Sequence, residues 1–360
     1  MMKTQKNNYC IILAGGIGRR LWPTSTKDLP KQFIDFFGTG RTLLQQTFDR
    51  FVRFVPVEHI FISTFEDYVP LVREQLPEVS PDHILPEPVQ LNTAQAAVWG
   101  TWHVALEDPE ARVVVSPADQ LIQHEDRFEE QILRGLDFVD EHAMFLALGV
   151  KPTLPNTAYG YIQMGDELNG EGLYKVQSFS EKPALDYARM FMESGEFLWN
   201  TGIFLWTAQL LGDTLAEKNG RASQKVEDLA RQMVTIAEEM NYVRSVFSND
   251  MPRSVDLFVL ESCCNVAVQE CTFGWADVGC WTELHETSHQ DADGNAVSGG
   301  AKVMFNGTQR CMVSLPEGKK AVIAGLDNFL VAEKDDVLMI CPNDNPDFTR
   351  RLINEAQVEL

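Results

Sequence analysis

A glycine-rich segment with several cations lies near the start of the chain. It reads YCIILAGGIGRRLWPTSTKDLPKQF over residues 9–33 and contains three closely spaced glycines, Gly15, Gly16 and Gly18. Glycine loops expose backbone N–H groups that bind phosphate, and Arg20 and Lys31 add the positive charge that suits a triphosphate. The segment lacks the G-K-[ST] end of a Walker loop and the third glycine of a G-x-G-x-x-G loop. A plain strand-to-helix turn is the alternative interpretation of the glycines alone.

A second segment whose residue types could do chemistry is HETSH, residues 285–289. It matches the H-E-x-x-H pattern of zinc proteases, in which two histidines one helical turn apart bind the metal. Such a site needs a third ligand, and no histidine follows His289. The surrounding ELHETSHQDADGN is polar on all sides, unlike a helix that is buried against an active site. We therefore interpret this segment as an exposed helix end.

The composition limits the possible ligands. The chain has 360 residues and a net charge of −22, which argues against a nucleic-acid-binding surface. An anionic ligand should therefore be small and held by a few cations, by backbone N–H groups or by a divalent metal. Apolar runs are far shorter than the ~20 residues of a membrane span, and no signal-peptide pattern precedes the first strand. We expect a cytoplasmic protein that binds no membrane, with seven reduced cysteines.

Apolar runs of strand length alternate with helical stretches in the first third of the chain. The strand-like runs are YCIILAG, HIFIST, HILPEP and RVVVSPAD, and helices are expected near residues 42–54, 68–76 and 93–106. This alternation predicts an α/β fold with a doubly wound, mostly parallel, Rossmann-like sheet. Ligands of such sheets bind beyond the carboxyl ends of the strands. The glycine loop and the SPAD segment should therefore lie at the same edge.

The pattern changes twice further along the chain. Short strands in AMFLALGVKP, YGYIQMGD and LYKVQSFSEKP predict antiparallel structure added to the sheet, followed by helices in ALDYARMFMESG and in residues 225–247. After about Asp291, short strands alternate with glycine and asparagine turns. We therefore expect a large first domain over residues 1–290 and a small, β-helix-like β domain over residues 291–360.

Seven segments, in order, resemble those of the nucleotidyltransferases that make nucleotide sugars. The first is L-A-G-G-x-G-x-R-L-W-P followed by P-K-Q-F, and the others are EPVQLNTAQAA, SPAD, YGYIQ, FSEKP, FLWNTGIFLW and WADVGCW. The W-P and P-K-Q-F elements resemble the mannose-1-phosphate guanylyltransferase branch in particular. One short match would carry little weight, but seven in the same order make chance an unsatisfactory explanation. The first domain would then be the catalytic one.

The resemblance implies a reaction in which GTP and mannose 1-phosphate give GDP-mannose and pyrophosphate. The sugar phosphate would attack the α-phosphorus in line, so cations must neutralise two anions that meet. Arg20, Lys31 and the loop amides would hold the triphosphate, and Lys182 would meet the sugar phosphate. Asp119 and Asp277 would hold Mg²⁺, which usually takes one or two protein carboxylates. Helix capping or turn formation is the alternative for each aspartate.

The same resemblance implies residues for the sugar and the base. Asn200 carries an amide that can both donate to and accept from a sugar hydroxyl, and Gly160 would let a ring approach the backbone. Glu181 would accept hydrogen bonds from sugar hydroxyls, with a solvated Glu-Lys surface pair as the alternative. Asn92 and Thr93 would lie near the base, although an N-cap for the following helix is compatible with that role.

Four positions depart from the pattern that is common in the branch. Leu91 stands in place of arginine, Gln95 in place of proline and Gln120 in place of histidine. Because all three are expected near the nucleotide, they leave the identity of the base open. Thr26 stands where a basic residue is common, which leaves one cation fewer for the phosphates.

Two other functions stay open. The nearer is a nucleotidyltransferase for another sugar 1-phosphate, such as a heptose phosphate, or for another base. The farther is a regulatory protein that binds nucleotide sugars without turnover, against which the presence of both Asp119 and Asp277 argues. A homodimer through the β domain is suggested by the resemblance alone.

Overall fold

A computed structural model of the chain describes residues 7–89, 92–168, 170–219, 235–247, 254, 255, 260, 261 and 263–359. The chain forms two compact units, each assembled from separate stretches. The first unit comprises Met1–Gly15, Phe48–Pro117 and Ile122–Trp275, and the second comprises Gly16–Thr47, Ala118–Leu121 and Ala276–Leu360. The second unit therefore contains residues 291–360 together with most of the glycine loop, so the units do not follow the expected boundary at residue 290. The division into a catalytic domain over residues 1–290 and a β domain over residues 291–360 stays a prediction from the sequence pattern alone.

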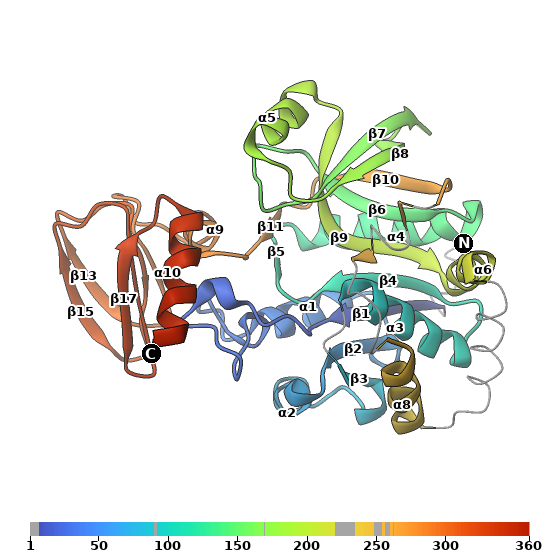
Figure 1. Cartoon of the computed structure of the whole chain (residues 1–360), viewed down its shortest axis with the longest axis horizontal. Coiled ribbons are helices and arrows are strands. Elements are labelled where there is room, and N and C mark those ends of the chain that lie inside the picture. Colours follow the sequence, from blue (N-terminus) through green and yellow to red (C-terminus); the bar gives the residue numbers. More distant parts are fainter. Residues whose placement is uncertain are drawn as a thin grey trace. The chain divides into compact units, whose positions relative to one another are not determined.

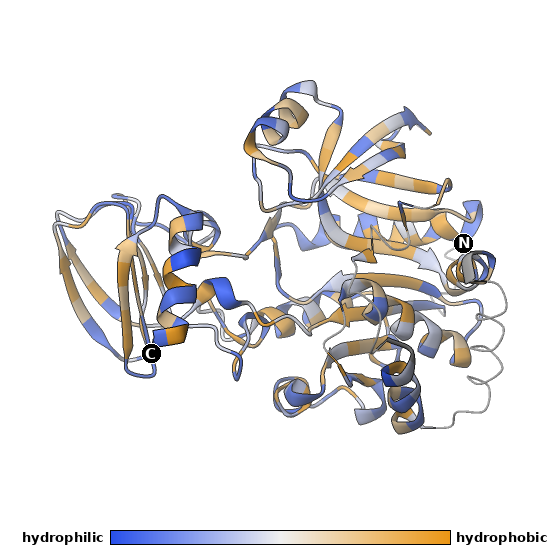
Figure 2. Cartoon of the chain, in the orientation of Figure 1, coloured by the Kyte–Doolittle hydropathy of each residue, from blue (hydrophilic) through white to orange (hydrophobic). Residues whose placement is uncertain are grey.

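A nine-stranded sheet, in the order β3-β2-β1-β4-β9-β6-β10-β8-β7, forms the centre of the first unit (Figure 1). Its strands, in chain order, are β1 (Asn8–Leu13), β2 (Ile60–Phe65), β3 (Ile84–Glu87), β4 (Arg112–Pro117), β6 (Phe145–Val150), β7 (Tyr161–Glu167), β8 (Leu173–Ser180), β9 (Phe197–Thr207) and β10 (Val266–Cys271). The strands β3, β2, β1 and β4 are parallel, as the sequence predicts. Figure 2 shows apolar residues along the central strands, where both faces are covered.

The rest of the sheet is mixed, which corrects the expectation of a mostly parallel sheet. Strand β9 runs antiparallel to both β4 and β6, and β8 runs antiparallel to both β7 and β10. Strands β10 and β6 add one more parallel pair. The short turn between β7 and β8 requires an antiparallel pair, because parallel neighbours need a long crossover connection. The expectation of added antiparallel structure in this part of the chain is confirmed.

The described helices agree in position with most of the sequence pattern. They are α1 (Leu43–Phe51), α2 (Val69–Gln75), α3 (Thr93–Glu107), α4 (Glu125–His142), α5 (Leu185–Ser194), α6 (Ala208–Asn219) and α8 (Ile236–Phe247). Helix α3 lies close to β1 at Gly100. A Cβ at this position would be only 2.9 Å from Ile11 Cδ1. Of the helix expected over 225–247, residues 225–234 lie outside the described residues. No helix of the described ranges combines the length and apolar character needed to cross a membrane.

From residue 281 onward, the described part of the second unit contains two small sheets and two α-helices. Strands β12 (Ala296–Ser298), β14 (Met312–Ser314) and β16 (Phe329–Lys334) are parallel neighbours, and β17 (Val337–Pro342) pairs antiparallel with β16. Strands β13 (Lys302–Asn306) and β15 (Lys320–Ala324) form a parallel pair, so the chain alternates between the two sheets. The helices are α9 (Trp281–Thr287) and α10 (Pro346–Glu359).

The apolar core of the second unit joins stretches that are distant in sequence. Leu21, Phe36 and Leu43 pack in one cluster with Val278 and Trp281, and with side chains of the last seventy residues, namely Ala296, Met312, Leu330, Ala332, Met339, Cys341 and Ile353. Each of these side chains is buried. The glycine-loop region therefore shares a core with the C-terminal strands.

Candidate active site

The ammonium group of Lys31 brings two of the predicted carboxylates together within the second unit. Its Nζ lies 2.9 Å from Asp119 Oδ2 and 3.4 Å from Asp277 Oδ1, and it donates to the carbonyl oxygen of Val278 at 3.2 Å. Burial opposes a charge on Lys31, but the two carboxylates outweigh burial and raise its pKa above the ordinary value. Lys31 is thus a fixed cation. Both aspartates that the sequence predicts as metal ligands form ion pairs with it.

The P-K-Q-F motif also supports the glycine loop. Lys31–Phe33 forms one turn of 3₁₀ helix, from which Gln32 Nε2 donates to the carbonyl oxygen of Gly16 at 2.8 Å. Gly18 has a φ of +67°, and a Cβ there would lie 2.7 Å from the Cγ atom of Lys31. Glycine is therefore required at position 18 both for the backbone conformation and for the approach of the lysine.

The aspartates are positioned by two short strands. Asp119 directly precedes β5 (Gln120–Ile122), and Asp277 is the last residue of β11 (Trp275–Asp277). These two strands pair with each other. The pairing explains why two aspartates far apart in sequence reach the same lysine.

Arg20 belongs to the same group of charges. A Cβ on Gly279 would lie 2.8 Å from Arg20 Nη2 and 2.9 Å from both Asp277 Oδ2 and Glu283 Oε2. Only a glycine at this position lets the guanidinium and the two carboxylates come so close together. Glu283 was not predicted from the sequence, where its signal is its place in the first turn of a helix after a glycine.

The first glycine of the loop lies in the first unit beside a buried carboxylate. A Cβ on Gly15 would be 3.2 Å and 3.3 Å from the two carboxylate oxygens of Glu87. Glu87 is 2% exposed, ends β3 and accepts a hydrogen bond from Ser63 Oγ at 2.9 Å. Glu87 was not predicted from the sequence either, although a carboxylate at the carboxyl end of a parallel strand is the kind of signal that marks a ligand site.

The two residues expected near the base begin helix α3. The Asn92 side chain accepts from the backbone N–H of Thr93 at 2.7 Å, so the N-cap interpretation of Asn92 is confirmed. Thr93 Oγ1 accepts from the backbone N–H of Val255 at 3.3 Å. Their contact with a base stays a prediction. Of the departures noted above, Gln95 and Gln120 are buried, and Leu91 lies outside the described residues.

The structure brings the three predicted sugar residues together in the first unit. A Cβ on Gly160 would lie 2.7 Å from Glu181 Oε1 and 3.4 Å from Asn200 Cβ. The backbone N–H of Asn200 donates to the carbonyl oxygen of Gly160 at 2.8 Å, which fixes the two segments side by side. Lys182 Nζ lies 2.9 Å from Glu181 Oε2, and the lysine side chain is 66% exposed. Glu181 and Lys182 therefore form the ion pair that the alternative interpretation expects.

The H-E-x-x-H segment has a different structure from a zinc-protease helix. Helix α9 ends at Thr287, so His289 lies beyond the helix and outside the required helical spacing. His285 Nε2 lies 2.7 Å from the carbonyl oxygen of Gly294 and, as an N–H donor, ties the helix to the following turn. Within the described ranges, no three His, Cys, Asp or Glu side chains converge as metal ligands.

The pair of aspartates nevertheless fits Mg²⁺. Both donors are carboxylates, and their side chains keep exposed fractions of 24% and 23% for further coordination. Mg²⁺ usually completes its octahedron with phosphate oxygens and water, so two protein ligands are sufficient. Asp119 and Asp277 are therefore the side chains that would hold the metal.

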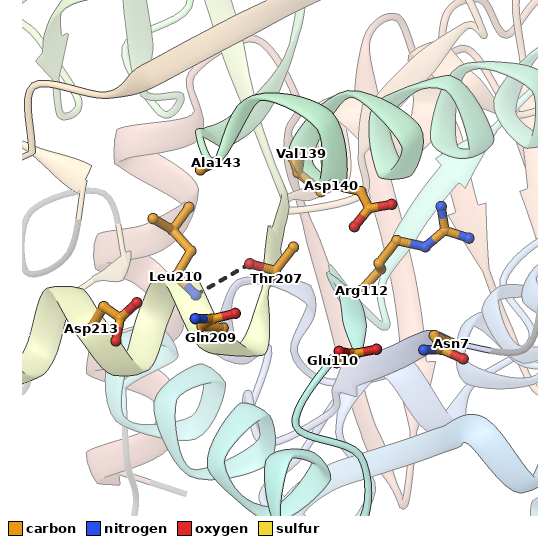
Figure 3. Close-up of a pocket in the computed structure, with 10 residues that line it drawn as sticks. All are labelled: Asn7, Glu110, Arg112, Val139, Asp140, Ala143, Thr207, Gln209, Leu210 and Asp213. Carbon is orange, nitrogen blue, oxygen red and sulfur yellow. Dashed lines mark hydrogen bonds between the residues drawn. The ribbon is translucent and has the colours of Figure 1, made fainter.

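A pocket of about 660 Å³ in the first unit contains none of the predicted site residues (Figure 3). Arg112 lies in it at the start of β4, next to Asn7 at the amino end of β1 and Thr207 at the end of β9. Ligands of α/β sheets bind at the opposite, carboxyl edge. The Arg112 guanidinium is held by Asp137 Oδ1 at 2.8 Å. This pocket therefore lies at the opposite end of these strands from the edge at which the sequence predicts ligand binding.

Comparison with known proteins gives a consistent result. The family model described as "Nucleotidyl transferase" matches residues 9–294. The mannose-1-phosphate guanylyltransferase of Escherichia coli strain K12 is 32% identical over 93% of this chain and 70% of its own length. The alginate biosynthesis protein AlgA of Pseudomonas syringae pv. tomato is 32% identical over 95% of this chain and 70% of its own length. A solved structure described as a mannose-1-phosphate geranyltransferase from Thermus thermophilus has a TM-score of 0.84 at 27% identity, and the match covers 98% of this chain and 99% of that one.

Proposed function

The chain belongs to the nucleotidyl transferase family, and from this premise we propose that it transfers GMP from GTP to mannose 1-phosphate. The products are GDP-mannose and pyrophosphate. The observation that carries the proposal is the group formed by Lys31, Asp119 and Asp277 beside the glycine loop. A fixed cation and two carboxylates next to exposed backbone N–H groups suit a triphosphate and its metal.

In the proposed mechanism, position and charge account for most of the rate. Lys31, Arg20 and the loop amides hold the triphosphate so that its α-phosphorus faces the incoming phosphate oxygen. Lys182 leaves Glu181 to meet the sugar phosphate, and Glu181 then accepts hydrogen bonds from sugar hydroxyls. Asp119 and Asp277 would hold Mg²⁺, which would supply positive charge to offset the negative charge of the phosphates. Attack is in line, and pyrophosphate leaves on the opposite side without a covalent enzyme intermediate.

Glu87 supports guanine as the base. Guanine presents two adjacent donors, N1–H and the N2 amino group, whereas the same edge of adenine, cytosine and uracil carries no two adjacent donors. A carboxylate has two acceptor oxygens and no donor, so it matches guanine alone. The carboxylate of Glu87 lies beside Gly15, at the start of the loop that would hold the phosphates of the same nucleotide.

We further propose Mg²⁺ as the metal, the cytoplasm as the location and a homodimer as the assembly. The two partly exposed carboxylates, Asp119 and Asp277, support the metal. The proposed location rests on the short apolar runs of the sequence, and the homodimer rests on the family resemblance.

The test of the function is release of pyrophosphate by the purified protein. GTP, ATP, UTP and dTTP are each supplied with mannose 1-phosphate, glucose 1-phosphate or a heptose 1-phosphate in the presence of Mg²⁺. We expect the highest kcat/KM for GTP with mannose 1-phosphate. A higher value for another pair would reassign the substrate, and no release from any pair would refute the catalytic proposal.

A further inference from the structure

Glu283 is a buried carboxylate that the proposed mechanism does not use. It lies in the first turn of α9, is 8% exposed, and accepts a hydrogen bond from the backbone N–H of Gly279 at 3.0 Å. A buried carboxylate is costly unless hydrogen bonds or opposite charges compensate it. Its presence at this point therefore needs an explanation.

Part of the explanation is the start of α9. The N-cap residue is Cys280, and its side chain makes no capping hydrogen bond. Burial, and after it the charge of Glu283, raises the pKa of Cys280 to about 12, so the thiol stays neutral at physiological pH. Glu283 stands three positions after the N-cap and reaches back to a backbone N–H, as the glutamate of a capping box does. Capping alone, however, would be served equally well by a glutamine.

The position of Glu283 among the charged groups accounts for the rest. Its Oε2, Arg20 Nη2 and Asp277 Oδ2 all lie within 2.9 Å of the point where a Cβ on Gly279 would be. The opposite oxygen of Asp277 faces Lys31, which also holds Asp119. Negative and positive groups therefore alternate in this part of the second unit, in the order Asp119, Lys31, Asp277, Arg20 and Glu283. Glu283 stands at the end of this series, beside the guanidinium.

Arg20 needs such a neighbour. It is exposed, and a long cationic side chain loses considerable rotamer freedom when it is fixed on a ligand. We propose that Glu283 is a positioning residue: its negative charge orients the Arg20 guanidinium toward the triphosphate, and its hydrogen bond fixes the turn that presents Asp277. The phosphate-binding role of Arg20 is itself part of the proposed function, on which this inference rests.

Glu283→Gln separates the two tasks, because the amide oxygen can still accept from Gly279 while the charge is lost. We expect the KM for GTP to rise about tenfold, the effect of weakening one charge-assisted contact. The KM for mannose 1-phosphate and the midpoint of urea unfolding should stay near the wild-type values. Glu283→Ala removes the cap as well and should also lower the unfolding midpoint. Glu286→Gln, an exposed position of the same helix, is the matched control.

A double variant tests whether Glu283 acts through Arg20. In an Arg20→Gln background, Glu283→Gln should raise the KM for GTP no further. An unchanged KM in Glu283→Gln, an equal rise for both substrates, or additive effects in the double variant would overturn the inference.

Equilibrium titration of GTP–Mg²⁺, without the sugar phosphate, gives a readout that needs no turnover. If the wild-type protein releases no pyrophosphate but binds GTP about tenfold more tightly than Glu283→Gln, the proposed function fails and the role of Glu283 stands. Equal affinity in wild type and variant would refute the role of Glu283 alone. Absence of binding in the wild type would refute both.

Discussion

At the scale of single residues, Glu87 should set the choice of base. Glu87→Gln replaces one acceptor by a donor, which then faces a donor of guanine. We expect kcat/KM for GTP to fall ~100-fold, equivalent to about 2.7 kcal/mol, while the low value for ATP changes little. Initial rates of pyrophosphate release measure both. Glu58→Gln, at an exposed position, is the control, and an equal loss for GTP and ATP would show that Glu87 only supports the fold.

The two aspartates should act through one metal ion. Asp277→Asn keeps the shape of the side chain and removes one negative ligand, so kcat should fall by ~100-fold or more, about 3 kcal/mol. Asp119→Asn should behave in the same way. The double variant should be little worse than the worse single variant, because both ligands serve the same ion. Asp140→Asn, an exposed aspartate on α4, should have normal kcat. Near-normal turnover in Asp277→Asn would place the metal elsewhere.

Lys182 should contribute to the sugar phosphate and not to the nucleotide. Its side chain is exposed and held by Glu181, so it is available to an incoming anion. Lys182→Ala should raise the KM for mannose 1-phosphate about tenfold and the KM for GTP less than about twofold. Lys175→Ala, on the exposed side of β8, is the control. Similar increases for both substrates would contradict the assignment.

The sequence predicts some of these residues better than others. Lys31, Asp119 and Asp277 each lie in a motif that matches the family pattern, and the structure joins them as one group. Glu87 and Glu283 were missed because the local sequence does not show that a glutamate is buried. Their burial comes from the packing of other segments, such as the approach of Gly15 to Glu87.

At the scale of secondary structure, a buried carboxylate fixes helix α8 to helix α3. Glu239 is 4% exposed, accepts from Trp99 Nε1 at 3.1 Å and lies 2.9 Å from His103 Nδ1. Glu239→Ala leaves both ring N–H groups buried without an acceptor, which should lower the free energy of unfolding by about 2–3 kcal/mol. Urea denaturation measures the change. Asn241→Ala, at an exposed position of α8, should change it by less than about 0.5 kcal/mol, and a similar effect of the two substitutions would refute the role of Glu239.

The elements themselves differ in how far they follow from the sequence. The start of α3 at Thr93 was predictable, because Asn92 caps it locally. The position of β9 between β4 and β6 was not, because it depends on pairing between strands that are far apart in the chain. Local propensity sets where a strand occurs, whereas packing against distant strands sets its neighbours.

At the scale of the whole molecule, the glycine loop depends on the C-terminal strands. Every residue predicted for the site precedes residue 291, so a fragment ending at residue 290 would keep the complete set. That fragment nevertheless loses much of the core around Leu21 and Phe36. It also loses a buried hydrogen bond at 2.7 Å from Ser298 Oγ to the carbonyl oxygen of Phe36, and a partly buried one at 2.9 Å from Lys334 Nζ to the carbonyl oxygen of Thr24.

We therefore expect residues 1–290 to lack an ordered phosphate site. Removal of several fully buried apolar side chains costs about 2–5 kcal/mol each, and the sum over the side chains lost exceeds the roughly 5–15 kcal/mol stability of most domains. The fragment should release pyrophosphate at less than about 1% of the full-chain rate, and residues 16–47 should be cleaved rapidly in limited proteolysis. A full chain carrying Val358→Ala, an exposed position of the last helix, is the control with normal turnover. A soluble fragment with cooperative unfolding and near-normal activity would instead show that residues 1–290 form an independent catalytic domain, as the sequence pattern alone predicts.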